Sequence, residues 1–314
     1  MSKLTLGEAG ERAIIAAITA AAPSGMNGDD AAVLAPPAPN SRTVATTDVL
    51  VADRHFRLDW STPEQVGEKA IVQNFADVEA MGARPVAALF GLAAPASLPI
   101  DVAAGIARGI NRRAGRYNAE LVGGDITESD CLVVSVTALG ILGGSQHPLT
   151  LDRARPGQHL VASGRIGYSA AGLALLQRHG LGYPRRFEAL VQAHLVPELI
   201  PGRGVVARAT GATSMTDNSD GLIQDLRHLA ERSGVSIDVH SKEIAPDELL
   251  VEAGKHLGVD PWEWVLSGGE DHTLLATTAK EAPSGFRTIG HVHRGRGVTV
   301  DGARPKYQSG WVSF

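Results

Sequence analysis

Hydrophobic residues along this chain follow two alternating spacings, one typical of helices and the other typical of strands. Apolar residues three and four positions apart follow a capping box at Thr5–Glu8 and predict an N-terminal helix that ends before Pro23. The tetrapeptide at 62–65 predicts a second helix up to about Ala80, because it combines a cap, a proline and a glutamine that closes the box. Further helices are predicted at residues 101–116, 169–178, 221–232 and 247–257, and strands at 31–34, 43–51, 86–92, 121–122, 132–142, 160–162, 213–216, 235–239, 273–277, 288–292 and 298–300.

This alternation of helices and strands runs through both halves of the chain and predicts an α/β fold. A chain of 314 residues is long enough for two domains. The best linker candidate is the segment from Gly143 to Pro148, near the middle of the chain. We therefore predict one domain over residues 1–145 and another over residues 146–314.

Composition narrows the class of protein. The net charge is −5, which argues against a general nucleic-acid binder, since such a protein would carry a basic face. No apolar run approaches the roughly 18 residues of a membrane span, and the N-terminus lacks a signal-peptide pattern. We therefore expect a cytoplasmic protein that binds neither nucleic acid nor membrane. The single cysteine, Cys131, lies in an apparent strand and is expected to be buried and unreactive.

Aspartates recur in short motifs beside glycine or small polar residues. Glycine lets the backbone come close to whatever the acid holds, and clustered carboxylates repel each other unless a cation lies among them. Oxygen donors without nearby cysteine or histidine favour Mg²⁺ over zinc. We therefore predict a metal-dependent phosphoryl-transfer enzyme. The motifs are Gly28-Asp29-Asp30, Thr46-Thr47-Asp48, Asn74-Phe75-Ala76-Asp77, Gly123-Gly124-Asp125 and Asp217-Asn218-Ser219-Asp220-Gly221.

Some of these motifs also have an ordinary structural interpretation. The motifs at 28–30 and 123–125 could be tight turns, the latter at the end of a short strand. Asp77 shares a helix face with Lys69 and Gln73, which could be a solvated ladder of ion pairs. Asp48 favours function, because an acid in the middle of an apolar strand is unusual unless it is exposed at an edge or ligated.

The motif at 217–221 follows a predicted strand and opens a helix, where ligands gather in α/β folds. Ser219 or Asp220 could merely cap that helix, but a cap needs only one such residue. The pair His291-x-His293 could bind metal, although no third ligand lies nearby in sequence. The sequence contains no Gly-x-x-x-x-Gly-Lys-Ser/Thr loop, which excludes a P-loop kinase.

Taken together, the motifs resemble the thiamine-monophosphate kinase family. This family lies within the superfamily of aminoimidazole ribonucleotide synthetase, selenophosphate synthetase and a hydrogenase-maturation protein. The resemblance covers essentially the whole chain, and His55-Phe56, the helix motif at 74–83 and the terminal aromatic motif indicate the thiamine branch. The matching stretches are 28–31, 46–48, 55–56, 74–83, 122–125, 156–157, 169–173, 217–222, 267–271 and 310–314.

The resemblance implies a two-domain aminoimidazole ribonucleotide synthetase-like fold, in which the N-terminal domain pairs across a dimeric β-barrel and the C-terminal domain is α/β. It implies a homodimer that uses ATP and Mg²⁺ to convert thiamine monophosphate to thiamine diphosphate. It also implies roles for individual residues. These are metal ligands at Asp30, Thr46, Thr47, Asp48, Asp77, Asp125, Asp217 and Asp220, ATP contacts at Gly124, Asp125, Arg153 and Ser219, and substrate contacts at His55, Glu270 and Trp311.

The chain departs from the family pattern at several positions. Glu79 stands where the family has a small apolar residue, Leu151 stands where an arginine is common, and His272-Thr273 replaces the usual Tyr-Glu. The alternative function is an ATP-dependent synthetase that forms an amidine through an iminophosphate. Selenophosphate synthesis is disfavoured because no cysteine precedes the motif at 28–30. A hydrogenase-assembly scaffold is also disfavoured, because its C-terminal tail would carry a cysteine and this one ends in Trp-Val-Ser-Phe.

Overall fold

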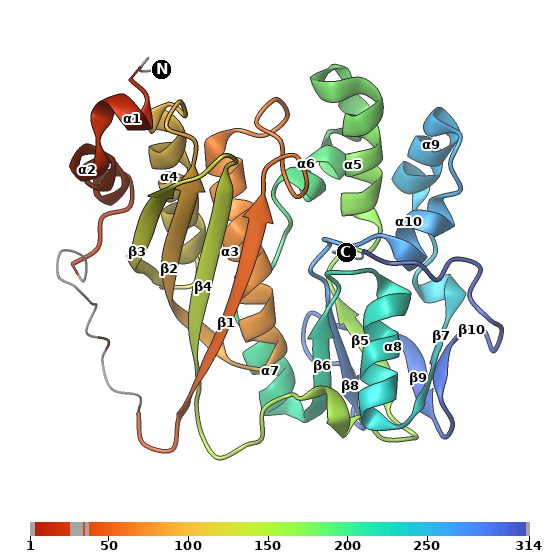
Figure 1. Cartoon of the computed structure of the whole chain (residues 1–314). Helices are drawn as coiled ribbons and strands as arrows, with labels where there is room; N and C mark the ends of the chain where they lie inside the picture. The colour runs from red at the N-terminus through yellow and green to blue at the C-terminus, as the bar shows by residue number, and fades with distance from the viewer. Residues whose placement is uncertain (1–3, 26–33, 35–37, 312–314) are drawn as a thin grey trace. The chain divides into compact units, whose positions relative to one another are not determined.

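The computed structural model describes residues 4–25, 34 and 38–311, and the chain divides into two compact units. The first unit comprises Met1–Val78 and Arg84–Gly144, and the second comprises Glu79–Ala83 and Ser145–Phe314. Each unit contains one β-sheet with helices packed against it (Figure 1). The predicted mixed α/β architecture is therefore confirmed. The predicted strand at 31–34 and the predicted site residue Asp30 lie outside the described residues.

The first unit has a sheet with strand order β1-β4-β2-β3. Strand β4 pairs antiparallel with β1 and with β2, and β2 pairs parallel with β3. The predicted capping boxes begin two of its helices: Thr5 and Glu8 bond each other's backbone, as do Thr62 and Gln65. The elements are α1 (Leu6–Ala9), α2 (Glu11–Ala21), β1 (Arg42–Val51), α3 (Pro63–Ala80), β2 (Arg84–Ala94), α4 (Ile100–Gly115), β3 (Glu120–Glu128) and β4 (Val133–Leu142).

The second unit has a sheet with strand order β10-β7-β9-β5-β8-β6, in which only the β10–β7 pair is parallel. Its elements begin with a short 3₁₀ turn at Leu151–Arg153. The strands are β5 (His159–Ser163), β6 (Ala212–Asp217), β7 (Ser236–Val239), β8 (Leu274–Thr278), β9 (Arg287–His293) and β10 (Gly297–Val300), and the helices are α5 (Tyr168–His179), α6 (Glu188–Leu195), α7 (Arg203–Thr210), α8 (Leu222–Ser233), α9 (Glu248–Leu257) and α10 (Pro261–Ser267).

Several boundaries differ from the sequence prediction for identifiable reasons. The N-terminal helix is broken into α1 and α2 at Gly10, whose φ of 74° no regular helix allows. Strand β3 continues to Glu128, so Gly123-Gly124-Asp125 lies inside a strand rather than at its end. Helices α6, α7 and α10 were not predicted, because none is longer than 8 residues and so none shows a sustained apolar period.

The expectation of a buried cysteine was wrong. Cys131 is exposed and lies in the turn before β4, which begins at Val133. Within β4 the buried residues start at Val134. Cys131 precedes the strand and belongs to the segment that connects β3 to β4. The apolar run at 132–142 therefore predicted the strand correctly but placed its start too early.

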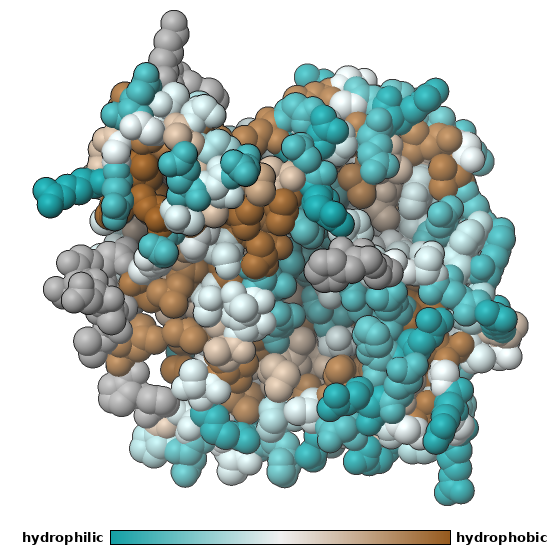
Figure 2. Space-filling model, in the orientation of Figure 1, coloured by the Kyte–Doolittle hydropathy of each residue, from teal (hydrophilic) through white to brown (hydrophobic). Residues whose placement is uncertain are grey.

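One face of the first sheet is covered by helices and the other carries none among the described residues. In Figure 1, α3 and α4 lie behind the sheet and its front face is bare. Strand β4 accordingly alternates between buried and half-buried positions. Val49 and Leu89 are 47% and 38% exposed, and Figure 2 shows hydrophobic residues gathered over this part of the surface. The described residues form no closed barrel, so the predicted β-barrel stays a prediction.

A group of histidines lies across the second sheet. His159 of β5 pairs with His291 of β9, which in turn pairs with Asp238 of β7. A ring nitrogen of His240 lies 3.2 Å from Nδ1 of His291. Burial lowers the pKa of His291, and the neighbouring His240, His159 and His293 lower it further, against an opposing effect of Asp238.

We expect this histidine group to make the stability of the protein depend on pH. Because the pKa of His291 is lower in the folded state, the unfolded chain takes up more protons as the pH falls below about 6.5, and the free energy of unfolding decreases. Urea denaturation between pH 8 and pH 5 measures this decrease. The variant His291→Gln should flatten it, whereas His147→Gln, at an exposed linker position, should not. An unchanged slope in His291→Gln would contradict the assignment.

No helix in the described part of the chain is both long and apolar enough to cross a membrane.

Candidate active site

In the first unit, β1 and α3 bring together four polar residues from two motifs. Thr46 and Asp48 are two residues apart in β1, so their side chains share the face that α3 covers. The Thr46 hydroxyl donates to Oδ2 of Asp77 on α3, at 2.7 Å. The Asp48 amide donates to Oδ1 of Asn74, which is fully buried and donates in turn to the Ala70 carbonyl. The site therefore joins the middle of a strand to the helix behind it.

The helix face that carries Asp77 is not a solvated ladder of ion pairs. Lys69 is only 2% exposed, and its ammonium group donates to the His55 carbonyl at 3.0 Å. The His55 ring is fixed as well, because its Nδ1 accepts from the Val51 amide at 3.0 Å. Lys69 thus anchors the loop that follows β1, where His55 stands.

Two of the predicted site residues lie on the opposite face of this sheet. Thr47 points away from its neighbours in the strand and bonds the Val136 carbonyl and the Thr137 hydroxyl. The register aligns Asp125 with Gly91, which is aligned with Ser135 and Val49, on the bare face. The structure therefore does not bring Thr47 and Asp125 beside Asp48 within one copy of the chain.

Gly124 is aligned with Phe90 of β2 and permits a close approach of β3 and β2. A Cβ atom at this position would lie 1.9 Å from the Phe90 carbonyl oxygen of β2. Only glycine fits there without displacing the neighbouring strand. Gly124 is therefore required by the sheet itself, independently of any contact with a nucleotide.

In the second unit, three segments that are far apart in sequence meet at the end of β6. The Glu270 amide donates to the Ser219 carbonyl at 2.8 Å, and the Trp311 amide donates to the Asp220 carbonyl at 2.9 Å. The Asn218 amide donates to the Thr273 carbonyl, and the Asn218 carbonyl accepts from the His272 amide. The motif at 217–221, the turn at 267–271 and the C-terminal segment therefore form one site.

The charges at this site are poorly compensated by the protein alone. Burial and the nearby Asp217 raise the pKa of Asp220. Burial, and then Asp217 and Asp220, raise the pKa of Asp225 to about 8. Asp217 is 5% exposed and its Oδ2 lies 2.9 Å from Nδ1 of His272. A bound cation would relieve the repulsion between these neighbouring acids.

Neither Ser219 nor Asp220 caps α8. Gly221 occupies the N-cap position and no side chain bonds the first turn from that position. Instead, the carboxylate of Asp225 reaches back and accepts from the amides of Asp220 and Gly221, at 3.1 and 3.0 Å. The Ser219 hydroxyl instead donates to Oδ1 of Asp217 at 3.3 Å, and Oδ2 of Asp220 accepts from the Gln224 amide group at 3.4 Å.

The predicted substrate residues are placed as follows. Glu270 has a φ of 62° and a side chain that is 29% exposed. Trp311 is 44% exposed, and its carbonyl accepts from Gln224. Backbone hydrogen bonds to the Asp220 carbonyl and from the Gln224 side chain thus hold Trp311 at this site. Arg153 lies in the 3₁₀ turn that opens the second unit, and it is half-buried.

Sequence reasoning missed the residues that support these groups. Asp225 could have been found, because an acid in the first turn of a helix commonly bonds free amides. Asp271 is buried and accepts from the amides of Gly167 and Ser169, and burial raises its pKa to about 7. His272 appeared only as a departure from a family pattern. Its contact with Asp217 depends on the tertiary structure.

The donor chemistry of both units fits Mg²⁺. Among the described residues, no three histidine, cysteine, aspartate or glutamate side chains converge into a complete metal site. The available donors are carboxylates and hydroxyls, which are hard oxygen ligands. The pKa of Asp220 is raised first by burial and then by repulsion from Asp217, and a cation would relieve that repulsion. Within each unit these residues therefore provide a partial set of ligands that suits Mg²⁺.

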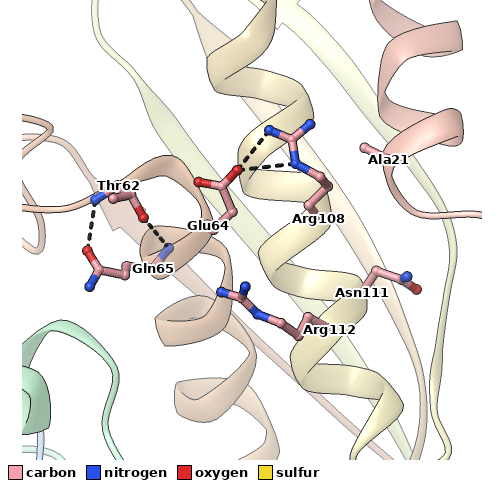
Figure 3. A pocket seen from close by; sticks show the side chains of 7 residues that line it. All are labelled: Ala21, Thr62, Glu64, Gln65, Arg108, Asn111 and Arg112. Carbon is pink, nitrogen blue, oxygen red and sulfur yellow. Dashed lines mark hydrogen bonds and ion pairs between the residues drawn. The ribbon is translucent and has the colours of Figure 1, made fainter.

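A separate hollow of about 640 Å³ lies in the first unit between α2, α3 and α4 (Figure 3). Arg108 donates through Nε and Nη2 to the same oxygen of Glu64, at 3.2 and 2.8 Å, and Arg112 pairs with Glu68. Gln65, which lines the hollow, is twelve residues from Asp77, or roughly 18 Å along the helix. Since its arginines are already paired, we assign this hollow no part in the site.

Comparison with known proteins agrees with this fold. The family model described as "AIR synthase related protein, N-terminal domain" matches residues 28–142. The match and the carboxylate-rich site define the class, a phosphotransferase related to aminoimidazole ribonucleotide synthetase. A thiamine-monophosphate kinase of Corynebacterium glutamicum is 63% identical over 314 residues, which cover 99% of this chain and 95% of the relative. This chain belongs to the thiamine-monophosphate kinase family.

Two further relatives support the assignment. A thiamine-monophosphate kinase of Mycobacterium tuberculosis is 49% identical over 91% of this chain and 85% of its own. The solved structure of AaThiL complexed with AMPPCP and TMP matches with a TM-score of 0.82 and 35% identity, over 98% of both chains. The family predicted from the sequence motifs is thus confirmed.

Proposed function

We propose that this enzyme transfers the γ-phosphoryl group of ATP directly to thiamine monophosphate and so forms thiamine diphosphate. The carrying observation is the convergence of the motif at 217–221, the turn at 267–271 and Trp311 on one site, where burial and neighbouring acids raise the pKa of Asp220 and Asp225. The related AaThiL was solved with AMPPCP, an ATP analogue, and TMP, which supports the same pair of substrates here.

The carboxylates would hold several Mg²⁺ ions. Bound cations would supply charge neutralisation between two phosphate groups that otherwise repel each other. Asp77 is oriented by the Thr46 hydroxyl and Asp217 by His272, so these carboxylates are held before any cation binds. The proposed ligands are Asp30, Thr46, Thr47, Asp48, Asp77, Asp125, Asp217 and Asp220, and the proposed ATP contacts are Gly124, Asp125, Arg153 and Ser219.

The acceptor needs no general base. A phosphate monoester has a second pKa near 6, so it is largely dianionic at neutral pH. The residues of the site therefore have to position the two substrates and neutralise their charge rather than remove a proton. We propose in-line attack on the γ-phosphorus without a phosphoenzyme.

The substrate contacts proposed are His55, Glu270 and Trp311. The half-exposed indole of Trp311 is available to stack on the positively charged thiazolium, an interaction of about 1 kcal/mol. The carboxylate of Glu270 would attract the same cation. The positively charged ring of the substrate would thus meet an aromatic side chain and a carboxylate, and both attract a cation.

The deciding experiment is ADP release from ATP and Mg²⁺ with thiamine monophosphate as acceptor. Thiamine and formylglycinamidine ribonucleotide serve as controls, and the product is identified as thiamine diphosphate. We expect activity with thiamine monophosphate alone, and its loss with EDTA. Activity only with the amidine precursor would reassign the chain to the synthetase branch.

We also propose a homodimer that pairs through the bare face of the first sheet. Val49 and Leu89 are exposed apolar residues on strands whose other face packs on helices. Such a face is typical of an interface. The proposed dimer would place Asp125, which lies on this face, beside the second copy of the chain.

We expect Leu89→Glu to shift the protein from dimer to monomer, because the new charge would be buried at the interface. Size-exclusion chromatography with light scattering at micromolar concentration measures this shift. The matched control is Leu181→Glu, at a residue that is 62% exposed in the second unit. A monomeric wild-type protein, or a dimeric Leu89→Glu, would refute this interface.

A further inference from the structure

We propose that His194, a buried histidine on α6, positions the carboxylate of Glu270 for the acceptor substrate, and that Ser169 on α5 orients its ring. The inference rests on the proposed function, in which Glu270 contacts thiamine monophosphate. His194 would act through Glu270 and would not itself touch the substrate. It is therefore a positioning residue of the acceptor site.

The contacts among the three side chains define this role. Nδ1 of His194 lies 3.1 Å from Oγ of Ser169 and 3.4 Å from Oε2 of Glu270. His194 and Ser169 are 5% and 1% exposed, whereas the Glu270 side chain is 29% exposed. A carboxylate only accepts hydrogen bonds, so the contact with Glu270 requires the tautomer or charge state in which Nδ1 carries a proton, which Oγ of Ser169 can also accept. The histidine thus joins a buried hydroxyl to a carboxylate that reaches the surface.

The backbone around Glu270 is fixed independently of its side chain. Its φ of 62° is a left-handed conformation that a residue with a Cβ atom adopts only under constraint. Its amide donates to the Ser219 carbonyl, and the neighbouring Asp271 binds the amides of Gly167 and Ser169. What remains variable is the direction of the Glu270 carboxylate, and the contact with His194 restricts it.

Close packing of α5 and α6 brings His194 into reach. A Cβ atom at Gly172 of α5 would lie 2.1 Å from the Leu190 carbonyl oxygen and 3.0 Å from Cβ of His194. Glycine at this position therefore allows the two helices to approach until Ser169, one turn earlier on α5, meets the imidazole. The geometry of the helix pair, rather than a flexible loop, sets the place of the ring.

The test is the kinetics of substitutions at His194. We expect His194→Leu to raise the KM for thiamine monophosphate about tenfold, the effect of one hydrogen bond to a charged group, with little change in kcat or in the KM for ATP. His194→Asn should restore most of the affinity, because its amide nitrogen takes the place of Nδ1. His194→Gln places its amide near Nε2 and should not. Equal rises of both KM values would overturn the inference.

A double substitution separates this inference from the proposed function. Glu270→Gln should also raise the KM for thiamine monophosphate, and His194→Leu should add little to it, because the two residues act as one unit. Fully additive effects would overturn the role of His194 alone. An unchanged KM in Glu270→Gln, with normal turnover, would overturn the role of Glu270 and the inference with it.

A second variant covers the case in which His194→Leu does not fold, as thermal melting would show. Ser169→Ala leaves the imidazole packed and removes only the oxygen that orients it. It should raise the KM for thiamine monophosphate in the same direction by a smaller factor, without changing the KM for ATP. An unchanged KM for thiamine monophosphate in this variant would overturn the orienting role of Ser169.

Discussion

Asp220→Asn is expected to lower turnover by about a hundredfold or more, the size of effect seen when a charge that stabilises the transition state is removed. The substitution keeps the shape of the side chain and removes the negative charge that would bind a cation. Steady-state kinetics with saturating ATP, Mg²⁺ and thiamine monophosphate measures the loss. Asp48→Asn should have a similar effect, because Asp48 is proposed to hold a cation in the other unit.

The melting temperature of Asp220→Asn shows whether the loss of turnover comes from lost function or from lost structure. Burial and Asp217 raise the pKa of Asp220, so its ionised form is unfavourable in the folded state above that pKa. Asn lacks the charge, and we therefore expect an equal or higher melting temperature together with the lost activity. Asp101→Asn, in the first turn of α4, is the control and should retain activity. If a high ATP concentration restores the rate of Asp220→Asn, this outcome would contradict the proposed role of Asp220 as a metal ligand.

Phe75→Ala is expected to lower the free energy of unfolding of the first unit by about 3–5 kcal/mol. Phe75 is fully buried on α3, and its ring meets that of Tyr117 edge to face, with 5.0 Å between centroids. The substitution removes this packing and leaves a cavity beneath the helix that carries Asp77. Since aromatics make up only 4% of the chain, few large side chains can fill the space.

Urea denaturation tests this prediction through the midpoint and slope of the transition. Because the chain has two compact units, a separate early transition in Phe75→Ala would assign the loss to the first unit. Leu181→Ala, at an exposed position, should change the free energy by less than about 0.5 kcal/mol. A loss below about 1 kcal/mol in Phe75→Ala would contradict the importance of this contact.

Much of the secondary structure could be predicted because the signals are local. The capping boxes at Thr5–Glu8 and Thr62–Gln65 bond as their spacing indicates. Long periodic segments became α3, α4 and β4 with small shifts at their ends. The short helices α6, α7 and α10 were missed since one or two turns give no clear period. Cys131 was misplaced because an apolar run does not show where a strand leaves the core.

Part of the site could also be anticipated from the same local rules. The roles predicted for the motif residues stay predictions, but Thr46 and Asp48 share a face as the period of a strand requires. The same rule would have separated Thr47 from them. The domain functions proposed for residues 1–145 and 146–314 stay predictions. Roles for His194 and His272 could not be predicted, since their partners lie on other elements.

The sequence alone determined the types of the long elements, the oxygen-rich chemistry of the motifs and the family to which the chain belongs. These properties depend on residue identity and on spacings of a few positions. Tertiary structure decided that Asp125 faces away from Asp48, that the segments at 217–221 and 267–271 and Trp311 meet, and that His194 lies against Glu270. The physical reason is that strand register and helix packing bring together residues that are far apart in the sequence, such as Asp220 and Trp311, and no local pattern carries that information.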